Sequence, residues 1–440
     1  MLRFHYYLRV IYAEKIYIEK MILDFMKGVF VVLDGVADEP CEILDGKTPL
    51  EVAKTENLDE LTKKGKLDYC YTIKEGVAPE SSSALISLFG EDYRYAPRGP
   101  LEAQGLGIPL KNGDLALRCN FASVKNLESG EILDRRCGRT LTTKEAKILA
   151  KEINENVKLP FKFEFYPGIQ HRGVLVFRGG FSDNITGADA AYSEGKARGD
   201  EGKIIFSKPL DDEEDSKLSS DLVNAFMRHS HEVLEKSSVN DVRKKKGLFP
   251  ANFIICRGPG SEVIKYKKLK GKWMALGYMP LEKGIAKAFG MDVYHFRYPK
   301  MRGIDVYDNL FSGLKKALKY SVKMLKRYKK KYDYFYIHIK ETDTPGHDNK
   351  PLEKVKMIEM IDERLFGFLN KYIGNGARLV VTADHTTACR KKRHTESPVP
   401  VLSCNIFDKK GNADRFTENE SRKGKKWEGR KLLEGSLFLK

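Results

Sequence analysis

Acids and histidines in the C-terminal part of the chain have the types and spacing of metal ligands. Asp343 and His347 stand four residues apart in ETDTPGHD, and Asp384 and His385 are adjacent in TADHTT. His394 follows in the polar loop RHTESP. Carboxylate oxygens and imidazole nitrogens together suit zinc, manganese and similar divalent cations. Two such cations can stabilise the attacking and leaving oxygens of a phosphoryl transfer, although each pair alone also fits a helix cap or an ordinary loop histidine.

A run of three serines offers a nucleophile for such a transfer. Residues 78–90 read APESSSALISLFG, with the serines at 81, 82 and 83. Serine is also common where helices start, so a polar helix cap explains the run equally well. A serine hydroxyl bound to a metal ion loses its proton more easily, which would activate it without a catalytic histidine.

Short apolar strands alternating with helices must position these residues. The strand-like runs cover residues 28–34, 173–179, 253–258, 334–340 and 378–384. Strands of this kind, separated by helical patterns, predict an α/β protein with a largely parallel sheet. Asp34, Asp343 and Asp384 stand at or just after strand ends, where ligands collect in such sheets. Pro345 and Gly346 favour a turn over a helix between Asp343 and His347.

Composition narrows the class of protein. The chain has 440 residues, a formal charge of +17 and seven cysteines without a Cys-x-x-Cys motif. Scattered cysteines in odd number argue against a disulfide framework and against a cysteine zinc site, so a reducing cytoplasm is expected. The positive charge fits a lysine-rich solvated surface or nucleic-acid binding, but no RNA-recognition, helix-turn-helix or zinc-finger pattern accompanies it.

The two ends of the chain carry separate expectations. Residues 1–25 lack the uninterrupted apolar core and small-residue cleavage site of a signal peptide. Translation from Met26 and an amphipathic N-terminal helix both stay open. No apolar run reaches the length of a membrane span. The last 25 or so residues are basic, and we expect them to be poorly packed.

The ordered motifs resemble those of a known family. They are DGVADEP, CNFASV with ILDRRCGR, SHEVLE, GLFPANFIICRG, IHIKETDTPGHD, TADHTT and HTESPVP. Their order resembles the alkaline phosphatase superfamily and, within it, the archaeal-type cofactor-independent phosphoglycerate mutases. The likeness runs from about Met26 to about Phe407.

The resemblance implies an activity and an architecture. The family interconverts 3-phosphoglycerate and 2-phosphoglycerate without 2,3-bisphosphoglycerate, through a phosphoserine, in glycolysis and gluconeogenesis. Its fold is an alkaline-phosphatase-like, mostly parallel sheet flanked by helices, with a second α/β domain inserted. The implied segments are an extension (1–25), a metal-binding domain (26–95 and 258–415), a substrate-binding insert (96–257) and a basic tail (416–440). The implied partner is small-molecule phosphoglycerate, with no nucleic acid and no membrane.

The resemblance also implies roles for single residues. Ser81 matches the nucleophile. Asp343, His347 and His394 match the ligands of one metal ion, and Asp34, Asp384, His385 and Ser81 match those of the other. Mn²⁺ is the favoured ion, with Zn²⁺, Co²⁺ and Mg²⁺ as alternatives.

Four further roles concern substrate and proton transfer. Asp134 could act as acid or base, while Arg136 and Arg139 could hold phosphate or carboxylate. Surface ion pairs are the other interpretation of these arginines. Lys283 resembles a lysine near the phosphoryl group, or is an exposed helix residue.

The serine segment departs from the family pattern P-G-S-D-T-A-H-L-S-L-L-G. Glu80 replaces the glycine, Ser82 the aspartate, Ser83 the threonine and Leu85 the histidine. These changes leave open a phosphatase or phosphotransferase acting on another phosphorylated metabolite. A non-catalytic or nucleic-acid-binding protein that keeps the fold is a third hypothesis, supported by the charge alone.

Overall fold

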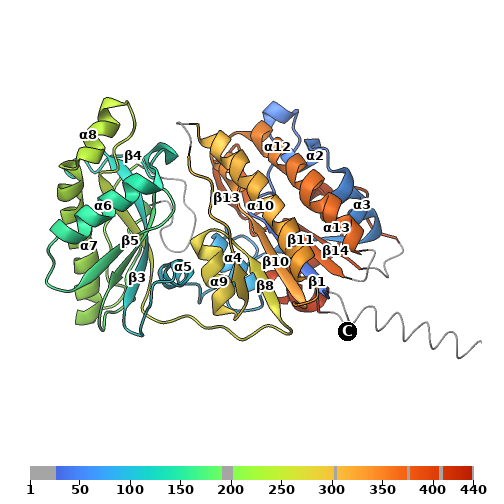
Figure 1. Ribbon diagram of the computed structural model, residues 1–440, viewed down its shortest axis with the longest axis horizontal. Coiled ribbons are helices and arrows are strands. Elements are labelled where there is room, and N and C mark those ends of the chain that lie inside the picture. The colour runs from blue at the N-terminus through green and yellow to red at the C-terminus, as the bar shows by residue number, and fades with distance from the viewer. Residues whose placement is uncertain (1–25, 191–201, 302–304, 374–376, 406–409, 439–440) are drawn as a thin grey trace, which may run out of the picture.

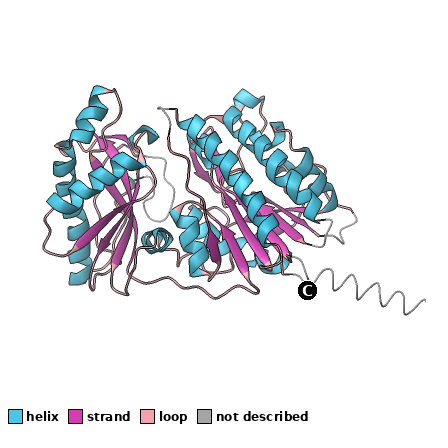
Figure 2. Cartoon of the chain, viewed as in Figure 1, coloured by secondary structure: helices cyan, strands magenta, loops and turns pink. Residues whose placement is uncertain are grey.

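Two large β-sheets, each with its own hydrophobic core, dominate the described part of the chain (Figures 1 and 2). A third sheet has only two strands, β12 Thr386–Ala388 and β13 Arg393–Thr395. The computed structural model describes residues 26–190, 202–301, 305–373, 377–405 and 410–438. The predicted extension 1–25 lies outside these residues.

The larger sheet has eight strands in the order β15-β2-β14-β11-β1-β10-β8-β9. The strands are β1 Gly28–Leu33, β2 Lys66–Tyr71, β8 Trp273–Leu276, β9 Asp292–Tyr294, β10 Tyr334–Ile339, β11 Arg378–Thr382, β14 Val399–Cys404 and β15 Lys426–Glu428. Only β14 runs antiparallel to its neighbours among these described strands. The central strands GVFVVL and YFYIHI are buried throughout, as parallel strands covered on both faces must be. The predicted α/β fold with a mostly parallel sheet is confirmed.

Helices pack around the larger sheet. They are η1 Glu42–Leu44, α2 Pro49–Val52, α3 Glu56–Lys64, α4 Ser81–Leu88, α9 Pro280–Ala288, α10 Val306–Tyr328, α11 Asp343–His347, α12 Pro351–Ile361, η4 Asp362–Phe366, α13 Gly367–Ile373, α14 Glu418–Ser421 and α15 Gly429–Ser436. Figure 1 shows α10, α12 and α13 across one face of the sheet. The stretch 48–65 holds two helices, α2 and α3, and the stretch 352–373 is interrupted by the π-helical turn η4.

The second sheet is antiparallel. Its strands are β3 Leu115–Val124, β4 Ile132–Asp134, β5 Phe163–Pro167, β6 Arg172–Phe177 and β7 Phe253–Gly260. Every described pairing among them is antiparallel, and it includes two runs that the sequence predicts as strands, 173–179 and 253–258. Its helical segments are η2 Cys137–Arg139, α6 Thr143–Asn156, α7 Glu214–Glu235 and α8 Ser238–Lys245. Figure 1 shows α7 and α8 on the side away from the larger sheet.

One helix joins the two parts. Helix α5, Arg98–Leu106, contacts α9 of the larger part and both β3 and β7 of the second sheet. The chain enters the second sheet after α5 and returns to the larger sheet at β8 after β7, which extends to Gly260. The insert predicted over 96–257 covers most of this excursion, and its boundaries stay a prediction.

The turn expected between Asp343 and His347 is not formed. Asp343–His347 forms the short helix α11, because Pro345 is tolerated in a first helical turn. Gly346 lets this helix lie close to the next loop, since a Cβ there would stand 2.7 Å from the Thr387 carbonyl oxygen.

The C-terminal residues are packed, against expectation. Strand β15 pairs in parallel with β2, and Leu432 and Leu433 of α15 are buried. The basic residues of this segment alternate with apolar ones, so one face of α15 can enter the core while its charges stay in water. Among the described residues, none of the helices combines the length and the apolar character of a membrane-spanning segment.

Candidate metal and phosphoryl-transfer site

The acids and histidines meet at one edge of the larger sheet. Strand β1 lies between β10 and β11, and all three run parallel. Their carboxyl ends therefore deliver Asp34, helix α11 and Asp384 to the same place. Gly35, at φ +56°, makes the close approach feasible, because a Cβ there would stand 3.1 Å from the Asp343 Cα.

The side chains form two groups. His385 Nε2 lies 3.5 Å from Asp34 Oδ1 and 3.3 Å from Asp384 Oδ2. Asp343 Oδ1 lies 3.4 Å from His347 Nε2 and 3.5 Å from His394 Nε2. The rings of His385 and His394 stack with centroids 3.6 Å apart, which brings the two groups together.

Two buried carboxylate oxygens in this cluster have no hydrogen-bond partner among the described residues. They are Asp34 Oδ1 and Asp384 Oδ2, which face the same histidine nitrogen. The other Asp384 oxygen accepts the N–H groups of Gly35 and His385 at 3.0 and 3.1 Å, which holds the side chain in this orientation. A buried charge without a partner is costly unless a cation compensates it.

The pKa shifts in the cluster also fit a metal site. Burial, with a contribution from Asp34, raises the pKa of Asp384 to about 7. Burial lowers the pKa of His347 to about 3 and that of His385 well below its usual value. Neutral imidazole is the form that binds metal. The predicted ligands therefore fit two divalent cations. They offer oxygen and nitrogen donors, and two of their carboxylate oxygens have no described hydrogen-bond donor.

Ser81 is the serine that reaches this cluster. It is the first residue of α4, it is buried, and its Oγ lies 3.1 Å from His385 Nε2. The Ser83 hydroxyl instead donates to the Glu80 carbonyl at 2.9 Å. The serine run thus combines an ordinary helix-start contact at one position with a hydroxyl beside the ligands at another.

A cavity opens beside Ser81 between the two sheets, and arginines line it. From the second sheet and its loops come Arg118, Arg135, Arg136, Arg139, Arg172 and Arg257, and from α5 comes Arg98. Asp343, His347 and His394 line the same cavity. Guanidinium groups opposite a hydroxyl nucleophile suit a substrate with phosphate and carboxylate groups.

Carboxylates already hold several of these arginines. Arg135 makes hydrogen bonds of 2.6 and 2.5 Å to the two oxygens of Asp189. Arg118 donates to both oxygens of Glu102, and Arg139 pairs with Asp348.

Arg172 differs from these paired arginines. In the part of the chain that the structure describes, no hydrogen bond or ion pair engages its guanidinium. Burial lowers its pKa from the usual value, since the charged form lacks full hydration. Sequence reasoning missed this residue, although it stands directly before the apolar run GVLVFRG at the cavity end of β6.

Only some of the remaining predicted site residues line the cavity. Arg136 and Arg139 line the cavity, whereas Asp134 and Lys283 are not among its described lining residues. The Asp134 carboxylate accepts the N–H groups of Arg136 and Gly138 at 2.7 and 2.8 Å. It therefore shapes the turn that carries the arginines.

Lys340, not Lys283, is the lysine that the structure brings to the ligands. Its Nζ donates to Asp34 Oδ2 and lies 3.8 Å from Glu282 Oε1. Burial lowers the pKa of Lys340, but Asp34 and Glu282 outweigh it, so the pKa lies above its usual range. The signal was present in IHIKETD, where a lysine follows a buried strand directly.

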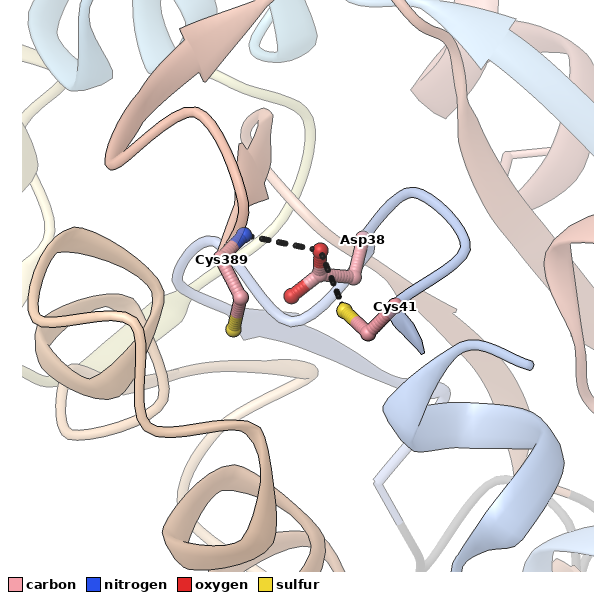
Figure 3. Close-up of side chains that lie close together, drawn as sticks. All are labelled: Asp38, Cys41 and Cys389. Atoms are coloured by element: carbon pink, nitrogen blue, oxygen red, sulfur yellow. Dashed lines mark hydrogen bonds between the residues drawn. The ribbon is translucent and has the colours of Figure 1, made fainter. Parts of the chain in front are cut away.

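A further group of ligand-type residues lies nearby (Figure 3). Asp38, Cys41 and Cys389 are buried with their polar atoms close together. Asp38 Oδ1 accepts the N–H groups of Glu39 and Cys389, and Oδ2 accepts Lys354 Nζ at 2.7 Å. Since both oxygens are engaged, this group acts as a structural anchor rather than as a metal site.

Known proteins resemble the chain over most of its length. A family model described as 2,3-bisphosphoglycerate-independent phosphoglycerate mutase matches residues 62–240. The curated protein of that name from Thermococcus kodakarensis is 37% identical over 405 residues, covering 90% of this chain and 93% of the relative. The one from Methanosphaera stadtmanae is 38% identical, covering 86% of this chain and 88% of the relative.

Solved structures also resemble the chain over most of its length. A Pyrococcus horikoshii protein is 28% identical with a TM-score of 0.69, covering 94% of this chain and 97% of that one. The cofactor-independent phosphoglycerate mutase from Thermoplasma acidophilum is 26% identical with a TM-score of 0.53, covering 94% and 99%.

Proposed function

Because the chain belongs to the family of 2,3-bisphosphoglycerate-independent phosphoglycerate mutases, we propose that it interconverts 3-phosphoglycerate and 2-phosphoglycerate through a phosphoryl group on Ser81. The observation that carries the assignment of the nucleophile is the Ser81 hydroxyl, 3.1 Å from His385 Nε2 and on the wall of the arginine-lined cavity. Phosphoglycerates are intermediates of glycolysis and gluconeogenesis, so the enzyme acts in the cytoplasm on a small-molecule substrate.

The enzyme is metal-dependent, and the acid–histidine cluster would hold the metal ions. Asp343, His347 and His394 would bind one, and Asp34, Asp384, His385 and Ser81 the other. When bound, two divalent cations supply positive charge that favours the Ser81 alkoxide and the developing charge on the phosphoryl oxygens. Mn²⁺ is our choice of ion, and Zn²⁺, Co²⁺ or Mg²⁺ would also suit this donor set.

The chain's own residues perform the transfer. The Ser81 hydroxyl loses its proton, Oγ attacks phosphorus, and a Ser81 Oγ–P bond forms. The bond from phosphorus to the glycerate oxygen breaks, and that oxygen takes up one proton to become a hydroxyl. Glycerate re-orients in the cavity, and its other hydroxyl oxygen takes the phosphoryl group back. Arg136, Arg139 and Arg172 hold the carboxylate and phosphate during this exchange. Asp134 acts by keeping the turn of Arg136 in place.

Lys340 keeps its positive charge beside Asp34 throughout the cycle. Its side chain lines the cavity, and its ammonium group donates a hydrogen bond to Asp34. We assign to it the stabilisation of negative charge on the phosphoryl oxygens, the role that the sequence suggested for Lys283.

A single assay tests the function. The Mn²⁺-loaded enzyme receives 3-phosphoglycerate without bisphosphoglycerate, and 2-phosphoglycerate and free phosphate are followed in the same tube. Isomerisation without phosphate release supports the mutase. Phosphate release alone identifies a phosphatase of the same fold, and normal isomerisation by Ser81→Ala would refute the phosphoserine route.

A further inference from the structure

Glu80 places a carboxylate among the arginines beside the nucleophile. Its Oε2 lies 2.9 Å from Arg257 Nη1 and 3.4 Å from Arg98 Nη1. Arg257 belongs to β7 of the second sheet, and Arg98 is the first residue of α5. Both arginines line the same cavity as Ser81. One side chain from the nucleophile segment therefore contacts two arginines of the cavity wall.

Local structure does not account for this orientation. Glu80 is the N-cap residue of α4, at φ −84° and ψ 152°, but its side chain makes no capping hydrogen bond. Shorter polar side chains at this position, such as aspartate or serine, usually accept the free N–H groups of the first helical turn. The Glu80 carboxylate points to the arginines instead, and its side chain is only 16% exposed.

The contact has the geometry of a bound anion. A carboxylate between two guanidinium groups is what a phosphate or carboxylate of a ligand would form there. Arg98 and Arg257 also reach Glu102 and Asp189, at 2.9 and 3.6 Å. The protein thus supplies its own anions to this part of the wall, whereas the described structure gives Arg172 no such partner.

We propose that Glu80 is a specificity-determining residue that fills an anion position formed by Arg98 and Arg257 with its own carboxylate. This proposal rests on the phosphoglycerate mutase function and deepens it. With that position filled, the cavity accepts the reacting phosphoryl group at Ser81 and one further anionic group at the Arg172 side. It discriminates against ligands that carry a third anionic group, such as bisphosphorylated acids.

Anion binding to the metal-loaded enzyme tests the charge of this position. Calorimetric titration with sulfate, at fixed ionic strength, compares the natural enzyme with Glu80→Ala. The backbone angles of Glu80 suit alanine, so no strain accompanies the change. We expect Glu80→Ala to bind one more sulfate ion than the natural enzyme. Equal sulfate binding by a folded Glu80→Ala would overturn the proposal.

Inhibition gives a second readout. We expect 2,3-bisphosphoglycerate to inhibit Glu80→Ala about tenfold more strongly than the natural enzyme, because a charged hydrogen-bonding pair becomes available to it. Glu80→Gln keeps the side chain in place and removes only the charge, so the gain should be smaller, about threefold. If Glu80→Ala does not fold, an unchanged inhibition constant in Glu80→Gln would contradict the proposal by itself.

A matched control removes a carboxylate from an arginine outside the cavity. Glu164 pairs with Arg178, and neither lines the cavity among the described residues. Glu164→Ala should leave the inhibition constant unchanged. A purely structural role of Glu80 predicts the opposite pattern, with Glu80→Ala raising KM for every ligand and gaining no affinity for anions.

The sulfate titration separates this proposal from the proposed function. It needs no turnover, so a gain in sulfate binding by an enzyme that does not isomerise phosphoglycerate would refute the mutase activity and support the anion position. Normal isomerisation with unchanged sulfate binding would refute the anion position alone.

Discussion

Asp34 and Asp38 lie in the same loop after β1, and each carboxylate pairs with a lysine, yet their surroundings differ. Lys354 beside Asp38 is fully buried and also donates to the carbonyl oxygens of Ala37 and Thr387, at 3.2 and 3.0 Å. Lys340 beside Asp34 is 18% exposed and lines the cavity. Asp34 keeps one oxygen without a described donor, while both oxygens of Asp38 are engaged.

The difference separates the candidate metal site from a cluster whose carboxylate is already fully hydrogen-bonded. Asp38, Cys41 and Cys389 are residues of types that bind metals. Their ligand atoms lie within 4.8 Å of one another, as do those of Asp34, Asp384 and His385. Residue type and proximity therefore do not distinguish the two groups. Their hydrogen bonds distinguish them, because a carboxylate whose oxygens already accept backbone and lysine hydrogen bonds gains little from a cation.

The largest expected effect comes from changing a proposed metal ligand. Asp384→Asn removes a charge that faces His385, and we expect metal content to fall and isomerisation to drop about a thousandfold. The metal-free variant should be at least as stable as the metal-free natural protein, because two adjacent buried carboxylates repel each other. Elemental analysis, turnover and thermal unfolding check the three statements. Full metal content with normal turnover would remove Asp384 from the site.

Asp38→Ala should lower the stability of the protein and leave its metal content unchanged. It leaves the fully buried Lys354 ammonium without its carboxylate, and we expect a loss of about 3–5 kcal/mol in the free energy of unfolding. Metal content per folded molecule should stay unchanged. Denaturant unfolding measures the loss.

The double variant Asp38→Ala/Lys354→Met is the control for Asp38→Ala. It should lose less than the sum of the single changes, since neither charge is left alone. Loss of metal from folded Asp38→Ala would show that this cluster binds after all.

The two lysines named for the site give a prediction of intermediate size. Lys340→Met should lower kcat about a hundredfold, because the charge beside Asp34 and the cavity disappears. Lys283, half-buried on α9 and outside the described lining, should change kcat less than threefold when replaced by methionine, as a change away from special features does. Steady-state kinetics on both variants test the assignment. A larger loss of kcat in Lys283→Met than in Lys340→Met would assign the role to Lys283.

The smallest effect is a change in pH dependence at the Asp38 cluster. Glu418 accepts the Asp38 N–H at 2.9 Å and the Thr48 hydroxyl at 2.7 Å. Burial, more than the nearby Asp38, raises the pKa of Glu418 to about 7. A pKa raised by folding contributes stability that is present below the unfolded value of about 4.3 and is lost as the pH rises through 7.

Glu418→Gln should therefore flatten this part of the stability profile. Unfolding free energies of both proteins between pH 4.5 and pH 8 measure the slope, at about half-unit steps. Parallel profiles would mean that Glu418 keeps its ordinary pKa in the folded protein.

Local patterns in the sequence were enough for the apolar strands β1, β6, β7, β10 and β11 and for the fold class. Buried parallel strands must be apolar along their whole length, so GVFVVL and YFYIHI are visible in the sequence itself. The acids that follow such strands predict a ligand-binding edge. The helix of Asp343–His347 and the packing of α15 were missed, because both depend on contacts with distant segments.

The sequence by itself determined which ligand-type residues exist and which edge of the sheet carries them, since strand ends are local and neighbouring parallel strands end together. Only the tertiary structure decided their partners: Lys340 for Asp34, Lys354 for Asp38, and Arg98 and Arg257 for Glu80. Most of these partners lie far apart along the chain. Burial makes every charge depend on its nearest neighbours in space, and that neighbourhood forms only when both sheets are in place.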